Sequence, residues 1–332
     1  MGNEIKRLIK SQLDFFLRRY SQIHQKERRL ENTFFFTGTP RSGTTWVYEI
    51  FSVLLNSSFG VWEPLNPRNY RILKRFEEPL RPYLNPANED QDLYQFFEAL
   101  LKGQLYQTST MERFDLQRFF RIAGSLDPLI VKSVRGNRIL PWLLEHFKLK
   151  NTCLLLRHPC AVISSQLSHE SWEYVKQPKN LKHPKIVREL LDELPRVREL
   201  VKEDLRPEEK LAVTWGFDYY APLRFMHRNN YQLLFYEHVV RNGREALIPV
   251  CKRFGIDYTG FDIDSLLNKK SMTSKEEEGD IANDPLSKWK FRLSAEQAER
   301  ILTIVRAFGL DFYDIHAEPD MGKFEQIQQK FN

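Results

Sequence analysis

Cysteine is scarce in this sequence, and its few copies follow no pattern. Cys153, Cys160 and Cys251 are an odd number at unrelated spacings, which excludes the disulfide framework of a small secreted domain. No Cys/His group has zinc spacing and there is no serine-hydrolase elbow, so zinc and acyl-enzyme chemistry are unsupported. We therefore expect a protein of a reducing compartment without a metal site.

Long apolar runs are absent as well. No stretch approaches the roughly 20 apolar residues that cross a bilayer, and the opening MGNEIKRLIK lacks the apolar region of a signal peptide. The net charge of +6 is moderate for 332 residues, so it favours an anionic ligand or surface without indicating nucleic acid. The sequence predicts a cytoplasmic protein without a membrane span.

The chain has no internal repeat, low-complexity tract or break in composition, so we predict one domain, residues 1–332. Residues 1–30 have the pattern of a basic amphipathic helix. We expect it to pack on the domain with its charges in water; the alternative is peripheral contact with an anionic membrane. Residues 66–128 predict a helical insertion that covers a site, and the charged residues 269–292 predict a mobile loop.

Short apolar stretches alternate with helical patterns along the chain. The expected strands are 33–38, 60–64, 128–134, 152–157 and 231–236, and the expected helices are 43–55, 138–147, 160–169, 186–203, 208–229, 243–254 and 294–308. This alternation is typical of an α/β fold built on a parallel sheet.

A glycine-rich loop, TGTPRSGTTW, joins the first predicted strand to the helix after it. Gly38 and Gly43 keep the spacing of a nucleotide-binding P-loop and Thr45 keeps its hydroxyl, but Thr44 stands where the lysine belongs. Backbone N–H groups at a helix N-terminus bind anions without that lysine. Arg41 supplies a cation that can hold a phosphate or sulfate bidentately. The loop therefore predicts an anion site.

A second cation follows another strand. Enzymes that hydrolyse nucleoside triphosphates hold Mg²⁺ with an acidic residue at such a strand end. Here TCLLL ends in Arg157, which favours a nucleotide held without metal at the carboxyl edge of the sheet. Ser165, eight residues later, could share the same phosphate. Arg157 alone would be an ordinary surface or salt-bridge residue. It indicates a ligand site only in combination with the glycine-rich loop.

These two segments resemble the sulfotransferases that use 3′-phosphoadenosine-5′-phosphosulfate (PAPS). T-G-T-P-R-S-G-T-T-W resembles their phosphosulfate loop, and R-H-P-C-A-V-I-S-S resembles their R-x₇-S motif for the 3′-phosphate. The resemblance implies a P-loop-type three-layer α/β fold with a central parallel sheet. It implies metal-independent transfer of a sulfuryl group to an acceptor hydroxyl, with adenosine 3′,5′-bisphosphate (PAP) as the product.

The resemblance also implies which residues bind the donor. These are Arg41, Ser42, Gly43, Thr44 and Thr45 at the phosphosulfate, Trp46 and Tyr236 at the adenine, Arg157 and Ser165 at the 3′-phosphate, and Lys288 and Lys290 in a closing C-terminal loop. The family's R-K-G triplet is absent, so the choice among Lys288, Lys290 and Arg292 stays open, with solvated charges as the alternative. Tyr236 could equally be an ordinary core residue.

Sulfuryl transfer needs cations for the charge that builds on the bridging oxygen and a base for the acceptor proton. Arg41 is the first candidate cation and Lys132 the second. Val134 stands where cytosolic members have a catalytic histidine, so the base must differ. Glu63 in VWEPLNP resembles the glutamate base of carbohydrate sulfotransferases, with a raised pKa or a hydrogen bond to the hydroxyl. Ion pairing is the alternative for Glu63, and His169 is the reserve base.

The whole pattern resembles bacterial and carbohydrate-type members more than cytosolic small-molecule ones. We therefore expect a saccharide, glycoconjugate or other small-molecule acceptor, a bacterial origin and no nucleic-acid partner. The aromatic side chains of the insertion would suit sugar faces or lipid tails: Phe96, Phe97, Tyr106, Phe114, Phe119 and Phe120. Two alternatives remain, a P-loop nucleotide kinase-like protein and a non-catalytic nucleotide-binding protein.

Overall fold

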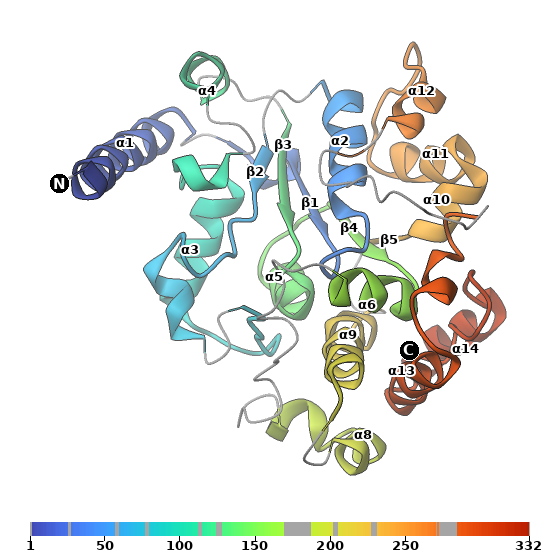
Figure 1. Cartoon of the computed structure of the whole chain (residues 1–332). Coiled ribbons are helices and arrows are strands. Elements are labelled where there is room, and N and C mark those ends of the chain that lie inside the picture. The colour runs from blue at the N-terminus through green and yellow to red at the C-terminus, as the bar shows by residue number, and fades with distance from the viewer. Residues whose placement is uncertain are drawn as a thin grey trace.

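Five short apolar stretches form one parallel sheet at the centre of the molecule (Figure 1). The strand order is β2-β3-β1-β4-β5. The strands are β1 (Thr33–Thr37), β2 (Gly60–Trp62), β3 (Leu129–Ser133), β4 (Asn151–Leu156) and β5 (Gln232–Phe235). The predicted α/β fold with a central parallel sheet is confirmed.

This computed structural model describes residues 2–25, 28–56, 60–76, 80–111, 115–123, 128–168, 187–201, 205–226, 231–269, 271 and 284–331. The α-helices are α1 (Gly2–His24), α2 (Thr44–Leu54), α3 (Gln91–Leu101), α4 (Leu116–Ala123), α5 (Leu140–His146), α6 (Pro159–Leu167), α8 (Pro195–Leu200), α9 (Pro207–Leu223), α10 (Tyr236–Asn242), α11 (Arg244–Arg253), α12 (Ile263–Asn268), α13 (Ala295–Ala307) and α14 (Met321–Phe331). Single-turn segments are η1 (Leu30–Asn32), η2 (Arg71–Arg75), η3 (Thr108–Thr110), η4 (Asn137–Ile139), η7 (Val187–Leu191, a π-helix turn) and η8 (Lys288–Phe291).

The sheet has an apolar cluster on each face because alternate strand residues point to opposite sides. Phe34 and Phe36 of β1 pack in one cluster with side chains of α2, α11 and α12. Phe35, between them, belongs to a larger cluster with side chains of α3, α5, α6, α9 and α13. Helices therefore cover both faces, which gives three layers and leaves the carboxyl edge of the strands for polar side chains.

The N-terminal helix differs from expectation. α1 projects from the body of the molecule (Figure 1), and only its second half, from Leu13 onward, contributes buried or partly buried side chains. The expected packing on the domain is found for that half alone. Among the described residues, no helix is long and apolar enough to cross a membrane.

The structure describes most of the predicted insertion, residues 66–128, but less than half of the predicted mobile loop, residues 269–292. Residues 66–128 contain η2, α3, η3 and α4, so the expected helical character is present where the chain is described. Most of 269–292 lies outside the described residues, and with it the prediction of a mobile loop. Its end forms η8, which packs beside α6.

Candidate functional site

A cavity of about 710 Å³ lies at the carboxyl edge of the sheet. Its walls follow directly after the strands: the loop after β1, Glu63 after β2, Val134 and Arg135 after β3, Arg157 after β4 and Tyr236 after β5. β1 lies between β3 and β4, so the chain leaves β1 at the point where the strand order reverses. Ligands of open α/β sheets bind at such switch points.

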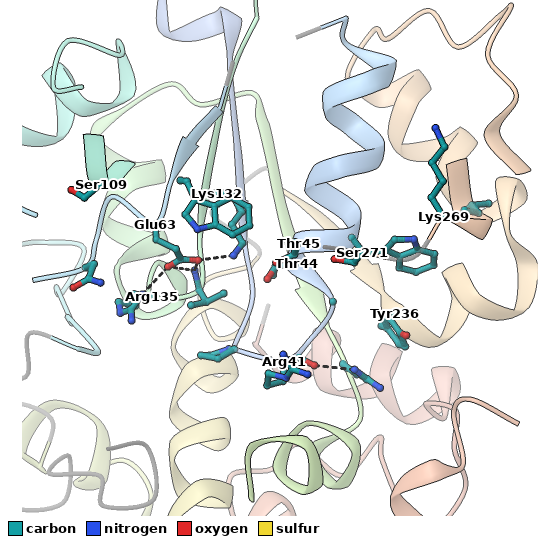
Figure 2. Close-up of a pocket in the computed structure, with 18 of the residues that line it drawn as sticks. Arg41, Thr44, Thr45, Glu63, Ser109, Lys132, Arg135, Tyr236, Lys269 and Ser271 are labelled. Carbon is teal, nitrogen blue, oxygen red and sulfur yellow. Dashed lines mark hydrogen bonds and ion pairs between the residues drawn. The ribbon is translucent and has the colours of Figure 1, made fainter. Parts of the chain in front are cut away.

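The cavity lining carries a strong excess of positive charge. Five of its residues are basic, namely Arg41, Lys132, Arg135, Arg157 and Lys269, and among its described lining residues Glu63 alone is acidic. Figure 2 shows Thr44 and Thr45 between the Glu63 cluster on one side and Tyr236, Ser271 and Lys269 on the other. A concave surface with this charge favours an anionic ligand.

The loop after β1 presents the N-terminus of α2 to the cavity. Thr44 and Thr45 are the first two residues of α2 and line the cavity. Gly43 caps the helix with a φ of 92°, and a Cβ there would lie 2.6 Å from the ring of Tyr236. Only glycine fits both the backbone angle and the space. The first N–H groups of α2 and its dipole therefore face the cavity, as an anion site requires.

Buried side chains fix the back of this loop. Thr39 Oγ1 donates to Asp218 Oδ2 at 2.9 Å, and Gln166 Nε2 donates to the carbonyl of Pro40 at 2.8 Å. Asp218 also accepts from Arg138 Nε at 2.7 Å, and both side chains are buried. The loop is thus held by α9 and α6 before any ligand arrives, which lowers the cost of ordering it on binding.

The two arginines singled out from the sequence meet at this loop. Arg157 Nη1 donates to the carbonyl of Arg41 at 2.9 Å, and the Arg157 guanidinium lies 4.2 Å from the centre of the Tyr236 ring. Arg41 Nε donates to Ser165 Oγ at 2.9 Å. Ser165 therefore contacts Arg41 here and is not among the cavity-lining residues, although Arg157 is.

The buried Arg157 Nε at this end has no hydrogen-bond partner among the residues that the structure describes. Buried polar groups are normally paired, so an orphan donor beside a cavity points to a ligand group. Ser42, which was expected to contact the donor, is buried and does not line the cavity. Trp46 completes this end, with its ring 5.7 Å from that of Tyr236 in an edge-to-face arrangement.

Glu63 and its partners form the opposite wall. Glu63 Oε1 is 2.6 Å from Lys132 Nζ, and Oε2 is 2.8 Å from Arg135 Nη1. The backbone N–H of Val134 donates to the same carboxylate at 3.2 Å. Lys132 also lies 4.1 Å from the centre of the Trp62 ring. Figure 2 shows the carboxylate between the two cations.

The pKa of Glu63 does not match the raised value expected of a base. Burial alone would raise the pKa of this carboxyl, but the positive charges of Lys132 and Arg135 and the hydrogen bonds from Lys132 and the Val134 N–H outweigh it. The pKa is therefore lowered, and the carboxylate is ionised and ion-paired. The ion-pairing alternative describes Glu63 in this structure.

The structure does not bring every predicted residue to the cavity. Lys288 and Lys290 of η8 are not among its lining residues, and Lys290 lies 5.6 Å from the Trp289 ring. Trp289 is buried and stacks on His158. His169 lies outside the described residues. The roles of these three residues stay predictions.

The aromatic cover predicted for residues 66–128 is wrong in its main members. Phe97, Tyr106 and Phe119 are buried in the large apolar cluster and do not line the cavity. The insertion instead contributes polar side chains to the cavity wall, namely Asn66, Asn69 and Ser109, the last of which is labelled in Figure 2. Phe114 lies outside the described residues.

Sequence reasoning missed Arg135, which follows β3 by two residues and pairs with Glu63. The signal was available, because Arg135 lies on the exit of the same strand as Lys132. Lys269 and Ser271 were assigned only to a general closing loop, yet both line the cavity. Within the described part of the chain, no group of three or more His, Cys, Asp or Glu residues has the arrangement of a metal site.

Comparison with known proteins finds similarity to solved structures, at low sequence identity. No protein-family model matches the sequence, and no curated protein matches it. The solved structures similar to this chain include a sulfotransferase domain from the Synechococcus PCC 7002 olefin synthase, at 18% identity and a TM-score of 0.35, covering 86% of this chain and 96% of that one. A sulfotransferase domain from the curacin biosynthetic pathway matches at 13% identity and 0.37, covering 90% and 96%. Both TM-scores are low, so we draw no functional conclusion from these structures.

Proposed function

We propose that this protein is a PAPS-dependent sulfotransferase that transfers a sulfuryl group to an acceptor hydroxyl without a metal ion. The observation that carries the proposal is the single cavity lined by both motif arginines, Arg41 and Arg157, around the N-terminus of α2. The described part of its lining has five basic residues and one acidic residue. This combination suits an elongated ligand with several negative charges better than a neutral one.

The donor would lie along the wall from α2 to Tyr236. The N–H groups at the start of α2, with Thr44 and Thr45, would hold the phosphosulfate. Arg157, whose buried Nε has no hydrogen-bond partner within the described part of the chain, would bind the 3′-phosphate. Ser165 joins it once Arg41 exchanges its hydrogen bond with Ser165 for a bond to the donor. The indole of Trp46 and the ring of Tyr236 offer an aromatic surface for the adenine.

The acceptor would enter on the Glu63 side. Trp62, Asn66, Asn69, Ser109 and Arg135 line this part of the cavity. An aromatic face, two side-chain amides and a hydroxyl match the apolar faces and hydroxyl groups of a saccharide or glycoconjugate. We therefore keep a glycan-type acceptor as the first choice.

Lys132 and Glu63 would act at the reacting centre. Lys132 is buried and held at 2.6 Å by Glu63, so its charge is fixed before the reaction and can stabilise negative charge on the departing nucleotide. Glu63 is ionised and can accept the acceptor proton only when its hold on Lys132 and Arg135 loosens. A carboxylate with a lowered pKa is a weak base, so its positioning of Lys132 is the larger contribution we assign to it.

The direct test is transfer of label from sulfur-labelled PAPS, in EDTA, to a panel of glycans, phenols, steroids and polyketide-like alcohols. We expect a labelled product with at least one hydroxyl acceptor and release of PAP. ATP turnover that requires Mg²⁺, with no transfer from PAPS, would favour the kinase-like alternative. Tight PAP binding without transfer to any acceptor would favour the non-catalytic alternative.

A further inference from the structure

The N-terminal helix α1 carries an exposed apolar face. Ile5, Leu8 and Ile9 have 52%, 62% and 61% of their surface exposed. These positions recur at the spacing of one helix face, and Phe15, Phe16 and Ile23 continue it. Single exposed apolar residues are ordinary, but a stripe along a whole helix indicates an interaction surface.

A second helix extends this surface. The ring of Phe16 lies 6.0 Å from that of Phe120 on α4, and the two rings are edge to face. Phe120 and Leu116 of α4 are each 40% exposed. We call the eight residues of this surface the apolar face: Ile5, Leu8, Ile9, Phe15, Phe16, Ile23, Leu116 and Phe120.

The helix is fixed to the body although it projects from it (Figure 1). Leu17 is fully buried in the large apolar cluster. Asp14 Oδ1 accepts hydrogen bonds from the backbone N–H of Thr108 at 2.7 Å and from its hydroxyl at 2.8 Å. The apolar face is therefore presented in one orientation, and Thr108 adjoins Ser109 of the cavity wall.

The charged side chains of α1 indicate the kind of partner that the apolar face binds. The helix contains five basic residues, Lys6, Arg7, Lys10, Arg18 and Arg19, and two acidic ones, Glu4 and Asp14. Asp14 is buried against Thr108, so Glu4 is the only exposed acidic residue on the helix. In the first turns, Lys6, Arg7 and Lys10 point away from the apolar stripe, as in helices that lie in a lipid interface.

A second copy of the chain would fit this surface poorly. A symmetric pair would join two chains that each carry a net charge of +6, and it would leave Lys6, Arg7 and Lys10, which point away from the apolar stripe, without an anionic partner surface. An anionic surface complements them, since each Lys or Arg near anionic lipids adds to binding.

We propose that the apolar face of α1 and α4 docks this protein on the surface of an anionic lipid bilayer. The apolar side chains enter the boundary between headgroups and acyl chains, and the basic side chains of α1 contact the headgroups. This inference does not depend on the proposed sulfotransferase activity.

The test is co-sedimentation of the full chain with phosphatidylcholine vesicles, with and without phosphatidylglycerol. We expect binding to the vesicles that contain phosphatidylglycerol, and loss of most binding when salt is raised from about 0.05 M to about 0.5 M. The double substitution Leu8→Ser/Ile9→Ser should weaken partitioning by about tenfold or more, because it removes two apolar side chains from the interface. Ile315→Ser, at an apolar residue that is 60% exposed elsewhere, is the matched control and should change nothing.

Light scattering and circular dichroism accompany the vesicle assay. Both variants should keep the wild-type circular dichroism, because the three substituted side chains are exposed. Failure of the wild-type chain to bind phosphatidylglycerol vesicles at low salt overturns the proposal. A dimer that Leu8→Ser/Ile9→Ser dissociates, without vesicle binding, would assign the face to a second copy instead.

Discussion

Two residues of the cavity wall adopt backbone angles that their side chains disfavour. Among the described non-glycine residues, positive φ occurs at Arg41 (74°), Glu63 (46°) and Asn56 (46°). Such angles cost about 1–3 kcal/mol each and persist where the surrounding structure enforces them. Two of the three lie in the cavity and carry its opposing charges, which supports a functional origin for the strain.

Substitution of Arg157 tests the binding of the donor's 3′-phosphate separately from the binding of its 5′ end. Arg157→Ala should weaken PAP binding by about 30-fold, on the order of 2 kcal/mol, because it removes a charge-assisted contact. Binding of AMP, which lacks the 3′-phosphate, should change much less. Calorimetric titration of both nucleotides measures this, with the exposed Arg244→Ala as the control. Equal losses for PAP and AMP would remove Arg157 from the 3′-phosphate.

Glu63 predicts a particular pH dependence. Its folded-state pKa is lowered from 4.5, so its ion pairs stabilise the protein above that pH and are lost as the pH falls through the lowered pKa. Turnover should therefore show no acid limb from Glu63 between about pH 5 and pH 7. Glu63→Gln should keep PAP binding and lose most of kcat. A wild-type acid limb near about pH 6 that Glu63→Gln abolishes would restore the raised-pKa base.

Single residues of the site were predictable where a strand end or a glycine loop marked them. Arg41, Thr44, Thr45, Trp46, Glu63, Lys132, Arg157 and Tyr236 all line the cavity. The pairing of Arg41 with Ser165 and of Glu63 with Arg135 was not predictable, because each joins segments far apart in the chain. Such contacts depend on the course of the loops after the strands, which the periodicity of apolar residues in the sequence does not indicate.

The loop from Gly38 to Gly43 and α2 act as one element, since the loop angle decides where the helix points. Gly43→Ala should be strained at a φ of 92° and should meet the Tyr236 ring. We expect a loss of about 1–3 kcal/mol in stability and a larger proportional loss of PAP binding. Chemical denaturation and titration measure the two effects. Gly255→Ala is the control for the effect of the backbone angle alone, because Gly255 also has a positive φ but no atom lies within 4 Å of the position of an added Cβ.

A Gly43→Ala protein with wild-type PAP affinity would show that the start of α2 does not contact the nucleotide. If Gly255→Ala and Gly43→Ala reduce stability equally, the loss comes from the backbone angle, and the contact with the Tyr236 ring contributes nothing to it.

Regular elements followed from the sequence where the apolar pattern was long or bounded by turns. All five strands and the helices α2, α5, α6, α9, α11 and α13 occur near their predicted ranges. The helices α10, α12 and α14 were missed. α10 begins directly after β5 and α12 has only six residues, whereas α14 follows the last helix that was predicted. The first half of α1 has the predicted helical pattern but not the expected partner, since periodicity shows an apolar face without showing what covers it.

At the scale of the whole molecule, the buried side chains of His158 and Glu237 should affect stability in opposite directions as the pH falls. His158 is buried against Trp289 and Tyr313, and burial lowers its pKa to about 4. Glu237 Oε1 accepts a hydrogen bond from the backbone N–H of His158, and burial raises the pKa of Glu237 to about 6. As the pH falls below 6.5, His158 is protonated in the unfolded chain but stays neutral in the folded one, so the free energy of unfolding decreases. As the pH falls from about 6 to 4.5, Glu237 is protonated in the folded chain before it is in the unfolded one, which offsets part of that decrease.

Stability should therefore depend on His158 in a pH-dependent way. The difference in free energy of unfolding between wild type and His158→Gln should shift by about 3 kcal/mol between about pH 7 and about pH 4, because only wild type loses the histidine contribution in acid. Urea denaturation at both pH values measures it. A difference that stays constant with pH would show that His158 titrates normally in the folded chain.

The most direct measurement is the affinity for PAP in the presence of EDTA, for wild type, Arg41→Ala, Arg157→Ala and the double variant. One nucleotide held by both arginines in one cavity predicts binding without a divalent ion, a loss of about 30-fold in each single variant and a larger loss in the double variant. Binding that disappears when Mg²⁺ is chelated, or affinity that neither substitution changes, would contradict the account.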